Sequence, residues 1–593
     1  MKHIVALFGL LIGLVFITSS TDLTTQTAVL AQDTQGGGSA TLYLPFLSAL
    51  PSYDLAITNI EVTQSVQTPN HQVPLVAQRH TLVRVFAQTI EGVSPSNVVV
   101  TLQGVRNGNT LGTLSADPRS IPTNPSRADF SSTVNFTLPA SWLSGNVTLI
   151  ANVNLADANA SNNVRQHVAN FNSVPALRVV IVPIRYTHTP TNQTYPAQSV
   201  DYISDWIQRS FPVHDVQVTM RTPHSFTGDL RSGNEWGRLL DRMYILKQGD
   251  GFSDNTPVFY YGFVPINNGS TQWFSSGIAG IGWVSPPDEA WRESVGINLG
   301  QNDNTGILAA HEFGHNMGRY HAPCGGPAGI DPGYPYTGAS IGQFGYDVGQ
   351  NALRNPATHR DVMSYCGPEW TSDYTYNALY ADQVKKGEDN WWSETGLPRQ
   401  QLLVRATLNQ AGGVELRPAY RFTASADTRP FSATLYEVQL LDAAGAIIAQ
   451  HPISLRMAEE PGVVARSFLG TVPLPSEPVA SMQIVSLAGE SPYVLAGQSL
   501  TSRDLAARTE ASLTETAVSI HLSWGNNNRP ALVRYTADEG ATWTTLAVDH
   551  IGGELVVDKE WLEGDSLLDE QANGRFEIIL ANGINANVLS IER

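Results

Sequence analysis

Basic residues are scarce in this chain, and so are long apolar runs. Its 593 residues hold 35 Lys and Arg against 53 Asp and Glu, a net charge of -18. Phosphate recognition needs clustered Lys and Arg, so the composition argues against a nucleic-acid partner. Beyond the N-terminal segment no apolar run reaches the ~20 residues that cross a bilayer, so we expect no membrane span in the mature chain. The oligomeric state stays open.

The N-terminal segment has the pattern of a targeting signal. Lys2 and His3 form a short basic start, and residues 4–18 form an apolar core that is short for a membrane span. Cleavage can follow Ser20 or Ala31, and we prefer Ala31. We therefore expect a signal peptide over residues 1–31, a Gly/Ser-containing linker over 32–52 and a secreted, extracellular protein. An uncleaved anchor is the alternative. The absence of cysteine after the apolar core argues against a lipoprotein.

The spacing of apolar residues divides the rest of the chain into four modules. Alternating apolar and polar residues between turn-rich stretches predict an Ig-like β-sandwich over residues 53–173 and β-sandwiches over 401–490 and 491–593. Residues 175–400 alternate buried strands with helices, which is typical of an α/β domain. There we predict strands at 177–184, 216–220 and 258–264 and helices at 199–211 and 234–246. The predicted fold class is a multidomain chain of α/β and all-β parts.

One short motif lies in the last module. Residues 536–543 match the Asp-box pattern S/T-x-D-x-G-x-T-W, which is usually a hairpin turn that closes on its own Asp and Trp. Sugar binding at this turn is the alternative.

Residues 307–321 carry the strongest chemical signal. His311 and His315 are four residues apart, so in a helix they lie on one face and can bind one ion at ~2.0–2.1 Å. Glu312 lies beside the first ligand and can accept the proton of a metal-activated water. Gly318 can take positive φ and end the helix, so that the chain turns back and His321 becomes a third ligand. Three protein ligands plus water are typical of a catalytic Zn²⁺ site.

This segment resembles the zinc-binding signature of the metzincin metallopeptidases. The resemblance implies a metzincin-like α/β catalytic domain and a downstream turn with a methionine beneath the metal, here Met363 in residues 361–366. It also implies that Tyr365 stabilises the oxyanion or binds zinc as a fifth ligand, with a packed tyrosine as the alternative. Residues 276–284 resemble the edge strand with which a substrate peptide pairs by β-augmentation.

The two cysteines bracket this region. Cys324 lies three residues after His321, and Cys366 lies three after Met363, so a bridge between them would tie the third-ligand loop to the methionine turn. Free thiols are the alternative. Because no cysteine precedes the predicted catalytic domain, latency through a propeptide thiol is excluded. The Asn- and Asp-rich residues 302–305 suit structural Ca²⁺, although a solvated loop has the same composition.

Together these features predict a zinc-dependent endopeptidase that hydrolyses an extracellular protein or glycoprotein substrate. Its layout resembles that of bacterial metzincins that act on glycoproteins. One alternative is a gluzincin peptidase, in which a distal Glu replaces His321. The other is a surface adhesin or glycan-binding protein with a vestigial metal site.

Overall fold

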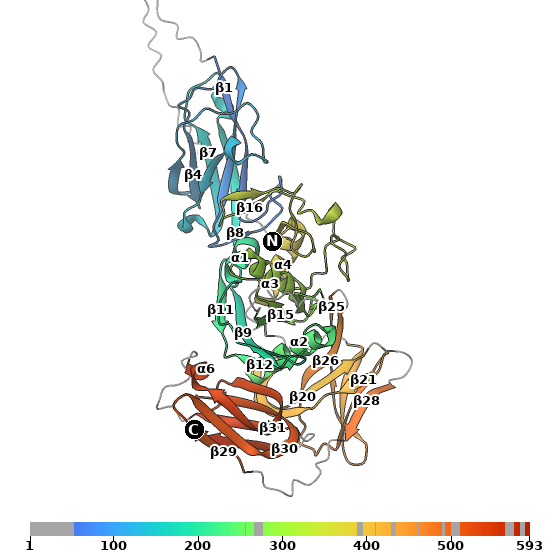
Figure 1. Cartoon of the computed structure of the whole chain (residues 1–593). Helices are drawn as coiled ribbons and strands as arrows, with labels where there is room; N and C mark the ends of the chain where they lie inside the picture. The colour runs from blue at the N-terminus through green and yellow to red at the C-terminus, as the bar shows by residue number, and fades with distance from the viewer. Residues whose placement is uncertain are drawn as a thin grey trace, which may run out of the picture. The chain divides into compact units, whose positions relative to one another are not determined.

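The N-terminal β-sandwich begins the part of the chain that the computed structural model describes. Its three-stranded and five-stranded sheets enclose one apolar core that includes Val85, Leu102 and Leu149, which confirms the predicted sandwich (Figure 1). The sheets contain β1 (Asp54–Thr63), β3 (Leu82–Glu91) and β6 (Val134–Thr137), and β2 (Leu75–Val76), β8 (Val164–Asn172), β7 (Gly145–Val153), β4 (Val100–Arg106) and β5 (Asn109–Ser115).

The structure describes most of the chain after the N-terminal segment. The predicted signal peptide and nearly all of the predicted linker lie outside the described residues. No helix within the described part is long and apolar enough to cross a membrane. The described residues are 52–254, 256–265, 277–387, 395–409, 411–427, 434–460, 463–488, 493–499, 510–563, 574–581 and 587–593.

A seven-stranded, mostly parallel sheet forms the middle of the chain. Its order is β10-β9-β13-β15-β14, with β11 and β12 also paired to β9. The strands are β9 (Leu177–His188), β10 (Gln193–Tyr195), β11 (Val216–Met220), β12 (His224–Gly228), β13 (Val258–Val264), β14 (Gly280–Gly282) and β15 (Glu293–Ile297). The helices are α1 (Ser204–Ser210), α2 (Gly233–Gly249), α3 (Asp303–Asn316) and α4 (Asp373–Gly387). Short pairs follow α3, namely β16 (Gly345–Asp347) with β17 (Ala352–Arg354) and β18 (Arg360–Asp361) with β19 (Glu369–Trp370).

Helices cover both faces of this sheet. Successive side chains of a strand point to opposite faces, so alternate residues of β9 pack against different helices. Val179 and Ile181 of β9 join the apolar cluster that contains α1 and α3. Val180 and Val182 join the cluster that contains α2. The continuous apolar run predicted at 177–184 is therefore a strand that is buried on both faces.

The predicted elements of this region agree with the structure in part. The strands at 216–220 and 258–264 match β11 and β13. The helix predicted at 199–211 begins later, because the Asp201 carboxylate accepts hydrogen bonds from the backbone N–H groups of Ile203 and Ser204 at its start. Helix α2 extends beyond the predicted 234–246. Strand β12 and helix α4 were not predicted.

The described residues of the C-terminal third form β-strands and one short helix. Two sheets enclose a core with Val404 and Ile484, and β28 pairs with β27, so the predicted split near residue 490 falls inside this sandwich. The described residues after 509 form one five-stranded sheet where a sandwich was predicted. The elements are β20 (Thr395–Leu408), β21 (Val414–Leu416), β22 (Tyr420–Asp427), β23 (Tyr436–Leu441), β24 (Ile447–Pro452), β25 (Leu455–Glu460), β26 (Val463–Pro473), β27 (Ser481–Ser486), β28 (Tyr493–Ser499), β29 (Ser512–Glu515), β30 (Ser519–Thr536), β31 (Thr544–Asp558), α6 (Lys559–Glu563), β32 (Arg575–Leu580) and β33 (Asn587–Glu592). The chain as a whole is mostly β.

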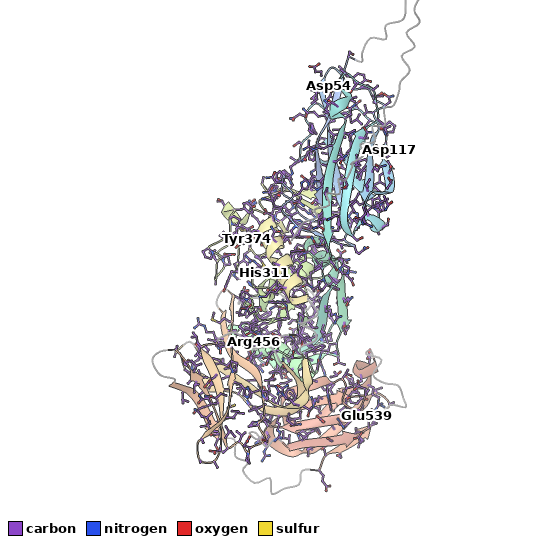
Figure 2. All side chains as sticks on the ribbon, turned by 180° about the vertical axis from the view of Figure 1, so that it is seen from behind. Asp54, Asp117, His311, Tyr374, Arg456 and Glu539 are labelled. Carbon is purple, nitrogen blue, oxygen red and sulfur yellow. A yellow bond between two sulfur atoms is a disulfide. The ribbon has the colours of Figure 1, made fainter. Side chains whose placement is uncertain are left out.

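A buried ion cluster joins the middle sheet to the C-terminal sandwich. Glu293 of β15 accepts from Lys247 of α2 at 2.9 Å and from Arg456 of β25 at 2.8 Å. All three side chains are 0–1% exposed. The Arg456 guanidinium, labelled in Figure 2, also lies over the rings of Tyr244 and Trp291. Because both oxygens of one carboxylate are used, the cluster depends on Glu293.

We expect the Glu293→Gln substitution to lower the free energy of unfolding by about 3–5 kcal/mol, because it leaves the buried Lys247 without its carboxylate partner and Arg456 with only the more distant Asp254 at 3.9 Å. Urea unfolding followed by tryptophan fluorescence measures the effect, since Trp291 stacks on the cluster. Glu554→Gln, on an exposed part of β31, is the matched control. Equal unfolding midpoints for the two variants would contradict this account.

Candidate metal centre

Helix α3 positions the first two predicted ligands. Asn302 caps its N-terminus, where the side-chain oxygen accepts from the backbone N–H of Asn304 at 3.1 Å. The buried side chains of His311 and His315 leave the same face, and their Nε2 atoms are 3.2 Å apart. The predicted helix and the i, i+4 pair are therefore both present.

The turn predicted at Gly318 ends this helix. Gly318 has φ 78°, its N–H donates to the carbonyl of His315, and the N–H of Arg319 donates to the carbonyl of Gly314. This pair of hydrogen bonds is a Schellman motif, which needs a residue with positive φ after the helix. The chain then turns back, and His321 Nε2 lies 3.1 Å from His315 Nε2.

Backbone carbonyls fix the protonation of all three imidazoles. The Nδ1 atoms of His311, His315 and His321 lie 2.8, 2.8 and 2.5 Å from the carbonyl oxygens of Val362, Arg319 and Ala328. A carbonyl only accepts, so each Nδ1 carries the proton, and a neutral ring then presents a lone pair on Nε2. Burial lowers the pKa of His311 to about 4 and that of His315 well below 6.5, which favours the neutral rings.

The converging lone pairs fit a cation. Ligand atoms ~2.0–2.1 Å from a tetrahedrally held ion lie roughly 3.3 Å apart, close to the observed 3.1 and 3.2 Å. Without a cation, three lone pairs at this spacing would repel one another in a buried site. The three histidines are thus arranged to hold a metal ion, with the carbonyl partners orienting each ring.

The methionine turn lies directly beneath the ligand helix. A Cβ on Gly314 would lie 2.2 Å from Met363 Sδ, so only glycine allows this contact. Met363 is buried, its N–H donates to the Asp361 carboxylate at 2.8 Å, and its carbonyl accepts from Ala322. The residue before it supplies the carbonyl that holds His311. The turn therefore fixes two of the three ligand segments.

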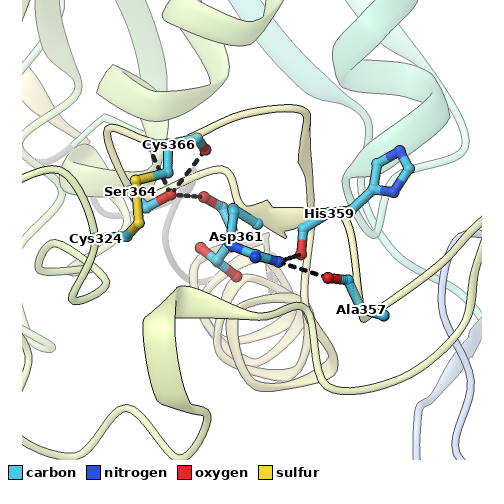
Figure 3. Close-up of a disulfide and its surroundings, with 7 residues drawn as sticks. Cys324, Ala357, His359, Asp361, Ser364 and Cys366 are labelled. Carbon is cyan, nitrogen blue, oxygen red and sulfur yellow. Dashed lines mark hydrogen bonds between the residues drawn. A yellow bond between two sulfur atoms is a disulfide. The ribbon is translucent and has the colours of Figure 1, made fainter.

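A disulfide between Cys324 and Cys366 ties the third-ligand loop to this turn (Figure 3). This confirms the predicted bridge over the alternative of free thiols. Next to it, Tyr365 N–H donates to the carbonyl of Cys324, and Ser364 Oγ donates to the carbonyl of Asp361. The bridge thus reinforces backbone contacts that already join the two segments.

Glu312 lies beside the histidines with a free carboxylate oxygen. Its side chain is 1% exposed, and Oε2 has no hydrogen-bond partner among the described residues. Burial and then the negative charge of Glu460 raise the pKa of this carboxyl well above its usual range. A Cβ on Gly280 of β14 would lie 2.4 Å from Glu312 Oε1, so glycine in the edge strand makes room for the carboxylate. An orphaned, buried carboxylate at this place fits a bound water or substrate group.

A fourth side chain that the sequence did not reveal completes the centre. Glu460, the last residue of β25, is buried, and its Oε1 lies 3.6 Å from His321 Nε2 and 3.8 Å from His315 Nε2. The four ligand atoms of His311, His315, His321 and Glu460 all lie within 4.8 Å of one another. This buried group could bind a metal ion. Glu460 belongs to another module and has no motif spacing to the histidines, so no local signal marked it.

Tyr365 contacts the same group. Its hydroxyl donates to Glu460 Oε2 and lies 3.3 Å from His321 Nε2. Burial and the negative charge of Glu460 raise the pKa of the phenol, which keeps it protonated as a donor. The structure therefore brings all predicted site residues together: the three histidines, Glu312, Gly318, Met363, Tyr365 and the two cysteines.

Cavities flank the centre on two sides. One of about 630 Å³ is lined by His315, His321 and apolar residues that include Trp291 and Met457. The other, of about 290 Å³, is lined by His311, Glu312, Tyr365 and Glu460. Both reach the histidines, so the metal group lies between two spaces large enough for side chains of a ligand.

The residues considered for a calcium site have structural roles. Asn302 is the helix cap, and Asp303 forms an ion pair with Arg209 at 2.5 Å, so the residues considered for calcium have other partners. Among the described residues, the histidine–Glu460 group is the one cluster of three or more potential His, Cys, Asp or Glu ligands.

The Asp-box segment, residues 536–543, closes on its own side chains, as the hairpin-turn interpretation predicted. Asp538 accepts from the hydroxyls of Thr536 and Thr542, and Trp543 stacks under Arg534.

Comparisons with known proteins add little to this geometry. No family model and no curated protein matches the sequence. Partly similar solved structures include a CARDB domain from Pyrococcus furiosus in complex with di-metal ions (13% identity, 21% of this chain and 97% of that chain, TM-score 0.15). A two-domain fibronectin type-III segment of chicken tenascin (15% identity, 34% and 95%, TM-score 0.13) and a β-glucuronidase from Parabacteroides merdae (7%, 91% and 78%, TM-score 0.15) are others. At these TM-scores neither a shared fold nor a shared function follows.

We expect His321→Asn to weaken Zn²⁺ binding by more than the roughly 10–100-fold that a change behind a ligand costs, because it removes one of the three converging nitrogens. Competition with a chromophoric chelator measures the dissociation constant. His359→Asn is the matched control, since His359 contacts Asn355 and Thr358 away from the centre. Unchanged affinity after the His321 substitution would remove this residue from the ligand set.

Proposed function

We propose that the protein is a secreted zinc-dependent endopeptidase of the metzincin type that cleaves extracellular proteins or glycoproteins. The observation that carries the proposal is the unpartnered Glu312 carboxylate beside three imidazoles whose Nε2 lone pairs converge. The sequence pattern of His311, Glu312, His315, Gly318, His321 and Met363 supports the metzincin type, as does the close contact of Met363 with Gly314. Secretion rests on the N-terminal signal pattern alone.

The residues of the chain divide the chemistry between them. Zn²⁺ held by His311, His315 and His321 would polarise the scissile carbonyl and lower the pKa of a water towards ~7. Glu312 Oε2 is placed to take the proton of the attacking water and to return it to the leaving amine. Burial and the negative charge of Glu460 raise the pKa of Glu312, which favours the protonated form that this second role uses.

A substrate peptide would lie along the edge of the middle sheet. Strand β14 pairs only with β15 within this sheet, so its other side is an edge next to the histidines. A peptide that adds to such an edge gains main-chain hydrogen bonds irrespective of its sequence. The apolar cavity wall formed by Trp291 and Met317 would then select a side chain next to the scissile bond. Tyr365, with its protonated hydroxyl, would donate to the developing oxyanion.

The geometry bears on both alternatives. A gluzincin site would not use His321, yet His321 Nε2 lies 3.1 Å from His315 Nε2 with its ring oriented by Ala328. A vestigial site in an adhesin has no need for a buried, unpaired general base, although its histidines could remain. Glu312 therefore separates the enzyme from the adhesin.

We expect Glu312→Gln to reduce casein or mucin cleavage by about 10²–10⁴-fold, because the amide cannot accept the proton of the water. Zinc content, measured by elemental analysis, should stay near that of the unsubstituted protein, since Glu312 is not a ligand. Glu554→Gln controls for the loss of a carboxylate elsewhere.

If the Glu312→Gln variant cleaves at the same rate as the Glu554→Gln control, the catalytic proposal is wrong. Absence of chelator-sensitive cleavage in the zinc-loaded protein, both unsubstituted and with the Glu460 carboxylate removed, would favour the adhesin.

A further inference from the structure

Strand β25 lies where the proposed substrate peptide would bind. The backbone N–H of Val284, just after β14, donates to the carbonyl of Met457 at 3.1 Å. This hydrogen bond uses a donor of the edge segment beside the metal centre. Three residues later along the same strand, Glu460 reaches the histidines. The strand thus contacts the edge at one end and the metal group at the other.

Glu460 fills the position that a catalytic centre leaves open. Three histidines are sufficient protein ligands for a catalytic zinc, and the fourth position belongs to water or substrate. Glu460 Oε1 converges on the same point as the three Nε2 atoms, and its Oε2 accepts from the Tyr365 hydroxyl. One side chain therefore engages both the open metal position and the group proposed to donate to the oxyanion.

The strand pairs with β26 along its whole length, and buried contacts away from the metal group hold it as well. Arg456 is buried against Glu293, and Ala458 is part of the core that contains α2. Neighbouring residues Leu455 and Met457 line the wall of the larger cavity. These contacts make the occupied state the stable arrangement of the chain.

We infer that β25 is a built-in inhibitory strand: Glu460 occupies the fourth metal position and Met457 the peptide-binding edge, so that ligands bind after this strand gives way. The inference rests on the proposed function for what the ligand is, a peptide. The chain supplies its own inhibitor from the C-terminal side, which fits the lack of any cysteine before residue 324 for a thiol-based block.

The test uses the full-length, zinc-loaded protein with Glu460→Gln and Glu460→Ala, and Glu554→Gln as the matched control. Acetohydroxamate, a small bidentate metal ligand, is the probe of the fourth position. We expect it to bind about tenfold or more tightly to Glu460→Ala, because apparent affinity falls with the fraction of chains whose site is open. Glu460→Gln should be intermediate, since an amide oxygen is a weaker ligand.

A second readout does not depend on activity. In the cobalt-substituted protein, loss of a carboxylate ligand should change the visible absorption bands in both Glu460 variants and leave the control unchanged. Cleavage of a short peptide should rise with hydroxamate affinity, because one of the two contacts by which the strand blocks the site, that of Glu460 with the metal position, is lost.

The outcomes separate this inference from the proposed function. Tighter hydroxamate binding and altered cobalt spectra without cleavage in any variant would support occlusion by Glu460 and reject the peptidase. Cleavage that falls in Glu460→Ala would overturn the inference and make Glu460 part of the catalytic machinery. Unchanged hydroxamate affinity and cobalt spectra in both variants would also overturn it.

Discussion

The candidate metal centre depends on repulsion between buried lone pairs and negative charge, which a bound cation would offset. Three imidazoles, each with its Nδ1 proton committed to a backbone carbonyl, direct lone pairs at one buried point, and the Glu460 carboxylate approaches the same point. In a low-dielectric environment such an arrangement is unfavourable unless a positive charge lies at its centre. The carbonyls of Val362, Arg319 and Ala328 come from three separate segments. Orienting the rings therefore depends on the loop that follows α3 and on the methionine turn.

Close approach of backbone and side chain is what lets those segments meet. Glycine at position 314 admits the Met363 sulfur beneath the ligand helix, and glycine at 280 admits the Glu312 carboxylate against the edge strand. Gly318 has a different role, since its positive φ reverses the chain towards His321. A side chain at these positions would displace the Met363 sulfur, the Glu312 carboxylate or the turn. The spacing of glycines in the sequence is thus as informative as that of the histidines.

The sequence revealed those parts of the site that are encoded within a few turns of chain. Helical periodicity relates His311 to His315, and Gly318 relates both to His321, so local rules predict the ligand set. The buried strand at 177–184 was visible for the same reason, because both faces of β9 are covered. Glu460 could not be found in this way, since tertiary packing of another module brings it to the histidines. The start of α1 at Ser204 depended on hydrogen bonds from the N–H groups of Ile203 and Ser204 to the Asp201 carboxylate, which apolar periodicity does not reveal.

Two different movements would open this centre, and they differ in what they admit. Rotation of the Glu460 side chain alone would free the fourth position for a small ligand while Met457 stays on the edge strand. Admission of a peptide requires β25 to leave the edge, which strains the buried Arg456–Glu293 pair. If breaking that pair costs about 3–5 kcal/mol, roughly one chain in 10²–10⁴ would have the edge free at equilibrium. The strength of the Arg456–Glu293 ion pair, which lies away from the metal group, would therefore set the fraction of chains that can accept a peptide. A binding partner or a proteolytic cut that separates Arg456 from Glu293 would raise that fraction without changing a metal ligand.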